Sequence, residues 1–232
     1  MVQPLRIGLL VPSSNTVMEP DFHRDIGPAG IVSTTRIFLE DVTRKSEIRM
    51  LEDELPKAVE LIRTTAPDVV VFGCTSAGAL GTLAHDDGIG EAINKRVGVG
   101  VVTVLRAVLT KLRTIAPRNV ALFTPYTEDL THCVASSLAE AGYPPVKAVG
   151  MGIRANLEIG RVTPSEIIRF VESQIEGCAP DCLFLSCTNW RAIETIEPLQ
   201  QKLGMPVITS NQTAVDEVRR LADNRFSTVS RM

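Results

Sequence analysis

The sequence reads VVVFGCTSAG over residues 69–78 and CLFLSCTNWR over residues 182–191. In both stretches an apolar run, which is typical of a buried strand, leads into glycine or serine, then cysteine, then threonine. Cys74 and Cys187 are therefore expected at equivalent places, where a strand ends and the chain turns. The recurrence of this pattern so far along the chain predicts a fold made of two similar halves.

The spacing between the two stretches recurs elsewhere. A separation of 113 residues relates three pairs: Cys74 and Cys187, Pro12 and Pro125, and Asp68 and Asp181. Three pairs at one spacing indicate an internal duplication. A duplicated fold places equivalent strand ends face to face across a pseudo-twofold axis, so we expect the two thiols to face each other across a cleft.

Short apolar runs and helical patterns alternate along the chain. The expected buried strands are residues 6–12, 32–39, 68–74, 97–104, 119–124, 146–153, 181–187 and 205–210. Most are continuous apolar runs, as expected for parallel strands covered on both faces. Eight strands with helices between them predict an α/β fold with two pseudo-symmetric lobes, each a small parallel sheet flanked by helices. The repeat indicates a first lobe of residues 1–104, completed by 208–232, and a second lobe of residues 105–207.

Several segments carry helical signals. Residues 46–65 have apolar residues at spacings of three and four, and these are Ile48, Leu51, Leu55, Val59 and Ile62. Pro56 is expected to kink or split this helix. Helices are also expected at 105–115, 128–141 and 189–203, and Thr163 followed by Pro164 predicts a capped helix start.

Composition and charge are those of an ordinary globular protein. The 232 residues are 44% hydrophobic and 22% charged, and the formal net charge is −3. No charge pattern suggests nucleic-acid binding, and no apolar run approaches the ~18 residues that span a bilayer. Five cysteines at irregular spacings do not form a disulfide framework, so a reducing cytoplasm is the expected compartment. The expected partner is a small molecule, rather than a nucleic acid or a membrane.

The turn after each cysteine predicts an anion-binding cradle. A thiol where a strand turns into a helix meets unpaired backbone N–H groups and the positive end of the helix dipole, which lower its pKa. The residues that follow the thiols are Thr75 and Ser76 in the first half, and Thr188 and Asn189 in the second. Their side chains suit a helix start, and the same geometry binds carboxylates. Each half therefore offers a nucleophile or base beside a carboxylate site.

Other polar residues belong to the same edge, because ligands of such sheets bind at the carboxyl ends of strands. Asn15 follows the first strand and is expected to donate a hydrogen bond to a substrate carboxylate. Tyr126 occupies the equivalent turn of the second half and could donate to a carboxylate or a transient enolate. Asn156, taken alone, is typical of a turn. The remaining cysteines and the three histidines match no metal-binding spacing, so no metal site is expected.

The set of motifs resembles the maleate cis-trans isomerases, within the aspartate/glutamate racemase superfamily. The resemblance covers nearly the whole chain and rests on VPSSNT at 11–16, GCTSAG at 73–78, FTPYTED at 123–129, IRANLEIGRV at 153–162 and SCTN at 186–189. It implies two pseudo-symmetric α/β lobes, no cofactor and a homodimer. It also implies catalytic roles for two residues and substrate binding by three, which are Cys74 and Cys187, and Asn15, Tyr126 and Asn156.

The resemblance further implies a mechanism. Maleate, or a close cis-dicarboxylate, would bind between the lobes, and the Cys74 thiolate would add to the double bond. Rotation about the resulting single bond and elimination of the thiolate would give fumarate. Cys187 would donate and retrieve the proton that these steps need, or stabilise the enediolate.

Other functions fit parts of the pattern. Amino-acid racemases of the superfamily use two thiols as alternating base and acid, similar sequences are associated with ectoine breakdown, and a non-catalytic protein could keep the carboxylate cradles. Arylmalonate decarboxylases share the lobes and a tyrosine like Tyr126 but keep only the second thiol, so Cys74 argues against that reaction. Fast alkylation of low-pKa thiols, with protection by a dicarboxylate, distinguishes an enzyme from a binding protein.

Overall fold

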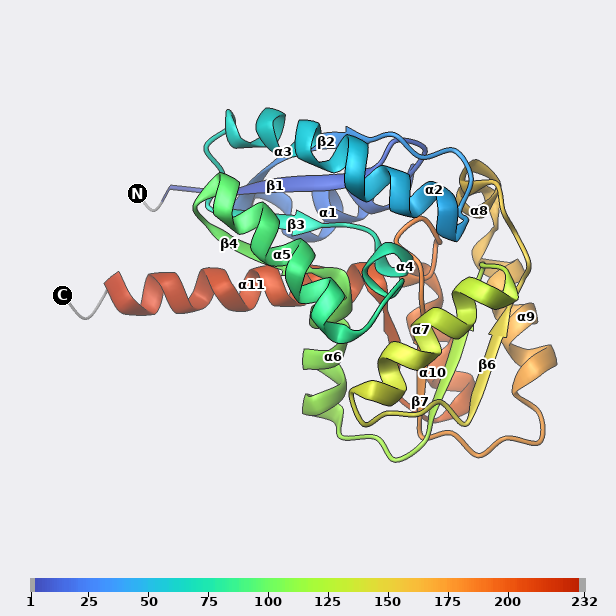
Figure 1. Cartoon of the computed structure of the whole chain (residues 1–232). Coiled ribbons are helices and arrows are strands. Elements are labelled where there is room, and N and C mark those ends of the chain that lie inside the picture. Colours follow the sequence, from blue (N-terminus) through green and yellow to red (C-terminus); the bar gives the residue numbers. More distant parts are fainter. Residues whose placement is uncertain (1–2, 230–232) are drawn as a thin grey trace.

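The computed structural model describes residues 3–229, which form two four-stranded parallel sheets flanked by helices (Figure 1). The first sheet has the order β2-β1-β3-β4 and the second β6-β5-β7-β8, so the two halves share one topology. The strands are β1 (Leu5–Pro12), β2 (Gly30–Ile37), β3 (Val69–Phe72), β4 (Gly100–Thr103), β5 (Val120–Thr124), β6 (Lys147–Gly150), β7 (Cys182–Leu185) and β8 (Val207–Thr209). The predicted fold class is confirmed.

The repeated aspartates have the same structural role in both halves. The Asp68 carboxylate accepts a hydrogen bond from the backbone N–H of Arg6 at the start of β1, at 2.9 Å. The Asp181 carboxylate accepts bonds from the N–H groups of Arg118 and Asn119 just before β5, also at 2.9 Å. Each aspartate thereby ties the beginning of one strand to its neighbour in the sheet, which explains why the pair recurs at the same spacing.

The helices cover the faces of the sheets. They are α1 (Met18–Ile26), α2 (Arg44–Arg49), α3 (Leu55–Arg63), α4 (Thr75–Gly78), α5 (Leu83–Val97), α6 (Val104–Ile115), α7 (Glu128–Glu140), α8 (Asn156–Arg161), α9 (Pro164–Ile175), α10 (Ile196–Leu203) and α11 (Ser210–Val229). The predicted helix cap is confirmed at the start of α9, where Thr163 and Glu166 form a capping box and Pro164 is the first helical residue. The helices α1, α5, α8 and α11 lie outside the segments for which the apolar pattern predicted a helix.

The predicted helix at 46–65 is interrupted. A π-helical turn, Met50–Glu54, separates α2 from α3, and Pro56 lies in the first turn of α3. Because proline has no N–H to pair with the carbonyl four residues earlier, the helix is distorted just before it. The extra residue of the π turn shifts the buried face of α2 by one position. Ile48 is consequently 38% exposed, whereas Glu47 is 0% exposed, so the predicted apolar stripe is wrong at this end.

The predicted helix at 189–203 is wrong over its first residues. A 3₁₀ turn occupies Ile193–Thr195, and α10 begins only at Ile196. The preceding turn is fixed by other contacts: the Asn189 side chain accepts a hydrogen bond from the Thr16 backbone N–H at 2.8 Å, and Trp190 packs edge-on against Phe170. A residue whose side chain is engaged in this way stabilises a turn rather than a helix.

The last helix returns to the first half of the molecule. α11 follows β8 directly, and contacts α6 and α1 (Figure 1). The main hydrophobic core contains side chains of both halves, so the halves share one buried interior. The lobe boundaries at 104 and 207 remain predictions. Within the described residues no helix is long and apolar enough to cross a membrane.

Candidate active site

Cys74 and Cys187 line one cavity between the two sheets. The cavity measures about 10 Å³, close to the space that one water molecule needs. Its wall consists of Pro12, Asn15, Leu39, Val42, Glu47, Cys74, Ser76, Tyr126, Asn156, Cys187 and Thr188. The two halves thus bring their equivalent thiols together, as the duplication predicts. None of the lining residues is a lysine or an arginine.

Cys74 lies two residues beyond β3, at the start of the four-residue helix α4. Burial raises the pKa of its thiol, and the nearby Glu47 carboxyl raises this pKa further. The Ala77 backbone N–H and the Ser76 hydroxyl lower it by a smaller amount. The expected low-pKa thiol is therefore wrong for the closed cavity, because α4 is too short to supply a strong dipole and the sulfur is nearly inaccessible to water.

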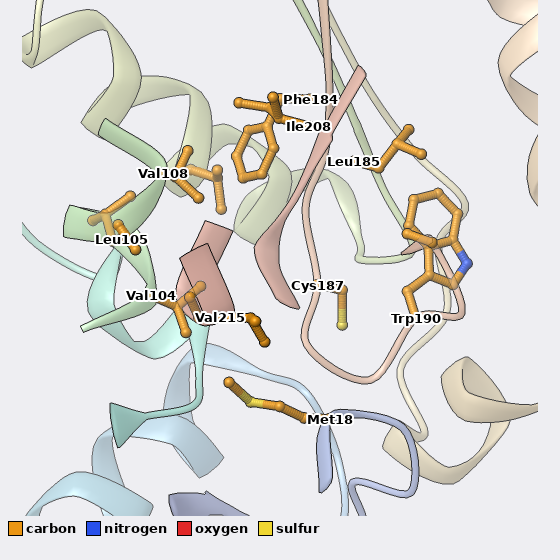
Figure 2. Close-up of a cluster of buried hydrophobic side chains, with 14 of the residues drawn as sticks. Met18, Val104, Leu105, Val108, Phe184, Leu185, Cys187, Trp190, Ile208 and Val215 are labelled. Atoms are coloured by element: carbon orange, nitrogen blue, oxygen red, sulfur yellow. The ribbon is translucent and has the colours of Figure 1, made fainter. Parts of the chain in front are cut away.

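Cys187 occupies the equivalent position after β7, among core side chains that include Met18 and Trp190 (Figure 2). Burial raises the pKa of its thiol to about 12. The Tyr126 hydroxyl and the Asn189 backbone N–H, which lies 3.3 Å from the sulfur, both donate hydrogen bonds that partly oppose this rise. The expected lowering of the pKa is again wrong, since no helix begins at this turn.

Tyr126 links the two thiols electrostatically. It is 2% exposed, and burial raises the pKa of its hydroxyl well above the ordinary value. The charges that Cys187 and Cys74 carry when ionised raise this pKa further. The hydroxyl therefore keeps its proton and remains a donor toward the Cys187 sulfur, which is the property that stabilises a thiolate or an oxyanion in a dry site.

The predicted polar residues divide into two groups. Asn15, Ser76, Asn156 and Thr188 line the cavity, whereas Thr75 and Asn189 do not. The Thr75 hydroxyl is 2.9 Å from that of Ser210 on α11. The roles of all these residues in substrate binding remain predictions.

The asparagines and Thr188 also join the two halves. The Asn15 side-chain amide donates to the Thr188 hydroxyl at 3.0 Å, and that hydroxyl donates to the Gly73 carbonyl at 2.9 Å. The Asn156 amide donates to the Ser14 hydroxyl at 2.9 Å. Because these groups already have partners, the cavity wall is pre-organised by bonds between the halves.

Glu47 is a cavity residue that the sequence reasoning missed. It enters from α2, is 0% exposed, and accepts a hydrogen bond from the Ser76 hydroxyl. Burial raises the pKa of its carboxyl to about 8. The only signal in the sequence was Pro56, which marks the helix distortion that turns Glu47 inward.

A strap from each half closes the cavity. The Val42 backbone N–H donates to the Arg154 carbonyl at 2.7 Å, and the Asn156 N–H donates to the Glu40 carbonyl at 3.0 Å. Asp41 and Ala155 form an antiparallel bridge between these bonds. We name residues 40–42 and 154–156 the closing straps. A cavity with room for one water has to open here, or elsewhere along its wall, before a larger molecule enters.

Comparison with known proteins agrees with this geometry. The chain is 24% identical to a maleate isomerase of Geobacillus stearothermophilus, over 94% of this chain and 92% of the relative. It is 27% identical to an arylmalonate decarboxylase of Bordetella bronchiseptica, over 93% and 90%. A cysteine-to-serine mutant of Nocardia farcinica maleate cis-trans isomerase, with a covalently bound succinylcysteine intermediate, superposes with a TM-score of 0.87 at 22% identity, over 95% and 94%.

The resemblance to the maleate isomerases is thus confirmed. A family model, described as arylmalonate decarboxylase, matches residues 7–231. Because this match spans almost the entire chain, the protein belongs to the arylmalonate decarboxylase family, and it shares its fold with the maleate cis-trans isomerases.

Proposed function

We propose that the protein is a cofactor-independent cis-trans isomerase of maleate or a close cis-dicarboxylate, and that Cys74 and Cys187 are its catalytic residues. The observation that carries this proposal is the pair of thiols in one closed cavity, each at the same turn of its own half. The maleate isomerases among its relatives support an isomerase activity. Amide and hydroxyl groups of the wall are able to hydrogen-bond to substrate carboxylates.

In the proposed reaction, Cys74 first gives its proton to a water molecule as substrate enters, and its thiolate attacks one alkene carbon. The π electron pair moves toward the adjacent carboxylate, and the Cys187 thiol protonates the second carbon to give a thioether with a C–C single bond. Rotation about that bond then becomes easy. The Cys187 thiolate removes a proton from the second carbon, the double bond re-forms, and the Cys74 thiolate leaves. The covalent route replaces a forbidding rotation about C=C.

The succinylcysteine in the Nocardia protein has the same kind of carbon–sulfur bond. It supports covalent addition in a protein of this fold. In our chain Tyr126 is a donor on the second thiol, so it would stabilise the Cys187 thiolate that forms when the proton is delivered.

Decarboxylation of an arylmalonate is the second candidate, because the Bordetella decarboxylase is 27% identical to this chain over 218 aligned residues. That reaction cleaves a C–C bond and protonates the resulting enediolate. A single thiol suffices for the protonation, so the reaction does not use Cys74. Dependence on Cys74 is therefore the property that separates the two candidates.

The test is proton NMR in D₂O with the purified protein and five separate substrates: maleate, maleamate, L-aspartate, L-glutamate and phenylmalonate. We expect a trans alkene signal from maleate, and its loss in both Cys74→Ala and Cys187→Ala. Loss of an α-proton signal from an amino acid would instead indicate a two-thiol racemase. Formation of phenylacetate that persists in Cys74→Ala would indicate a decarboxylase, and no change with any substrate would favour an ectoine-related acid or a binding role.

A further inference from the structure

Glu47 presents an unpaired oxygen to the cavity. Its Oε1 accepts a hydrogen bond from the Ser76 hydroxyl, but its Oε2 is buried and has no hydrogen-bond partner. A buried polar atom without a partner is destabilising, because it has lost its hydrogen bonds to water without replacement. Since the residue lines the cavity together with both thiols, a bound molecule is the group in position to satisfy this oxygen.

The charges of the cavity wall determine which interactions a bound dicarboxylate can make. The lining residues include no lysine or arginine, so a dicarboxylate there is held only by neutral donors. An ionised Glu47 would add a third negative charge at close range, and in a poorly solvated site this repulsion is large. A protonated Glu47 would instead add a donor, because a neutral carboxyl carries one O–H group.

The groups around Glu47 favour the protonated form. Burial raises the pKa of its carboxyl to about 8, and Asp129 on α7 raises it further, whereas the Ser76 hydroxyl and Arg44 on α2 lower it. The other titratable groups that interact with it are Cys74, Cys187, Tyr126 and Cys133. The first three keep their protons at neutral pH, and burial raises the pKa of Cys133 as well. Cysteine and tyrosine are neutral when protonated, so none of these four residues offers a positive charge that would stabilise an ionised Glu47.

We propose that Glu47 is a substrate-binding residue whose neutral carboxyl donates a hydrogen bond from Oε2 to one carboxylate oxygen of the bound dicarboxylate. The inference rests on the proposed function, because it takes a dicarboxylate as the ligand. The proton stays on Glu47 throughout, and no bond to substrate is exchanged. Ionisation of Glu47 would remove the donor and place a like charge beside the ligand, so binding and protonation of Glu47 favour each other.

The test is calorimetric titration with succinate between pH 6.5 and 9.5. Succinate is saturated, so it binds without being isomerised. If only the protonated form binds, the apparent affinity falls about tenfold for each pH unit above the pKa of Glu47. Glu47→Gln, a permanently neutral side chain that keeps a donor, should retain affinity at pH 9.5. Glu52→Gln, an exposed change in the same helical segment, should behave as the wild type. A Glu47→Gln profile that falls like the wild type, or a flat wild-type profile, would overturn the proposal.

A second measurement needs no variant. Carbon-13 NMR of protein labelled at the glutamate carboxyls should show one glutamate that titrates far above the others, and succinate should raise its midpoint. A midpoint that succinate lowers or leaves unchanged, or failure of succinate to bind at any pH, would overturn the inference. If the affinity for succinate depends on protonation of Glu47 while maleate is not converted, the isomerase proposal fails and the inference stands. If maleate is converted but Glu47→Gln binds succinate with the wild-type pH profile, the inference fails alone.

Discussion

Burial affects the pKa values of the two cavity thiols more than the hydrogen-bond donors around them do. Cys74 and Cys187 are each 5% exposed, and in both cases burial is the largest influence on the pKa and raises it. The hydrogen bonds from Tyr126, Ser76 and backbone N–H groups oppose this effect only in part. Both thiols are therefore protonated at neutral pH, and ionisation of Cys74 is a step that the proposed reaction has to include.

Replacement of Cys74 tests the nucleophile. Cys74→Ala should abolish conversion of maleate, since it removes the thiolate that adds to the double bond in the proposed reaction. The measurement is the initial rate by NMR, with mass spectrometry of acid-quenched enzyme for the succinyl adduct. Cys133→Ala on α7, a half-buried thiol outside the cavity wall, is the matched control and should keep full activity. Full activity in Cys74→Ala would show that Cys74 is not the nucleophile.

Replacement of Tyr126 tests the donor to the second thiol. Tyr126→Phe keeps the ring but removes a hydrogen bond that lowers the pKa of Cys187, so this pKa should rise above about 12. We expect kcat to fall on the order of ten- to a thousandfold, with a smaller change in KM. Tyr143→Phe changes the one other tyrosine of the chain and should leave both constants unaltered. An unchanged kcat in Tyr126→Phe would show that the hydroxyl has no part in the chemistry.

At the scale of elements, the π turn determines which side chain of α2 lines the cavity, and the closing straps are the expected point of entry for substrate. The π turn before α3 directs Glu47 inward, where a regular helix would have presented Ile48. The closing straps, residues 40–42 and 154–156, are held by two backbone hydrogen bonds and one bridge. Because the bridge between the straps consists of these two hydrogen bonds, we expect the straps to separate when substrate enters.

A cross-link across the straps tests this opening. Asp41 and Ala155 are exposed and form an antiparallel bridge, in which Cα atoms lie about 4.5–5.5 Å apart, within the range of a disulfide. Oxidation of the double variant Asp41→Cys/Ala155→Cys should lower kcat/KM at least tenfold, and dithiothreitol should restore it. Oxidised wild type controls for damage to the catalytic thiols. Undiminished turnover by the cross-linked form would show that substrate enters by another route.

At the scale of the whole molecule, side-chain amides bind the halves together behind the cavity. The Asn189 side chain accepts from the Thr16 N–H at 2.8 Å and donates to the Asn156 carbonyl at 2.6 Å. The Asn211 amide on α11 donates to Asp21 at 2.8 Å and to the Thr188 carbonyl at 3.0 Å. The bonds to Thr16 and to the Thr188 carbonyl join segments far apart in sequence, and both involve the turn that follows Cys187.

Removal of Asn189 tests this junction. Asn189→Ala leaves the buried Asn156 carbonyl without its side-chain donor, so the free energy of unfolding should fall by about 1–3 kcal/mol. Urea denaturation followed by circular dichroism measures the change. Asn94→Ala removes one exposed hydrogen bond at the end of α5 and should cost less. Catalytic activity should fall more in Asn189→Ala than in Asn94→Ala, because Asn189 belongs to the turn that follows Cys187. Equal stability of the two variants would contradict the assigned role.

Much of this architecture follows from local patterns. All eight predicted strands are present, because a continuous apolar run bounded by turn residues is a signal carried by neighbouring residues. The spacing of 113 residues indicated two like halves, and the sheets do share one strand order. Placement of Cys74 and Cys187 at one site followed from that symmetry alone. The amphipathic pattern was a weaker guide, since it missed α1, α5, α8 and α11 and began α10 too early.

The sequence by itself therefore determined the fold class, the duplication and the meeting of the two thiols, since these depend on the order of apolar and polar residues along the chain. Only the tertiary structure decided that Glu47 faces the cavity, that Asn189 joins the halves instead of lining the cavity, and that the thiols are neutral. The physical reason is that burial and hydrogen bonding depend on groups brought from distant parts of the chain. The pKa of a buried group depends on these surrounding groups, and the local sequence pattern does not identify them.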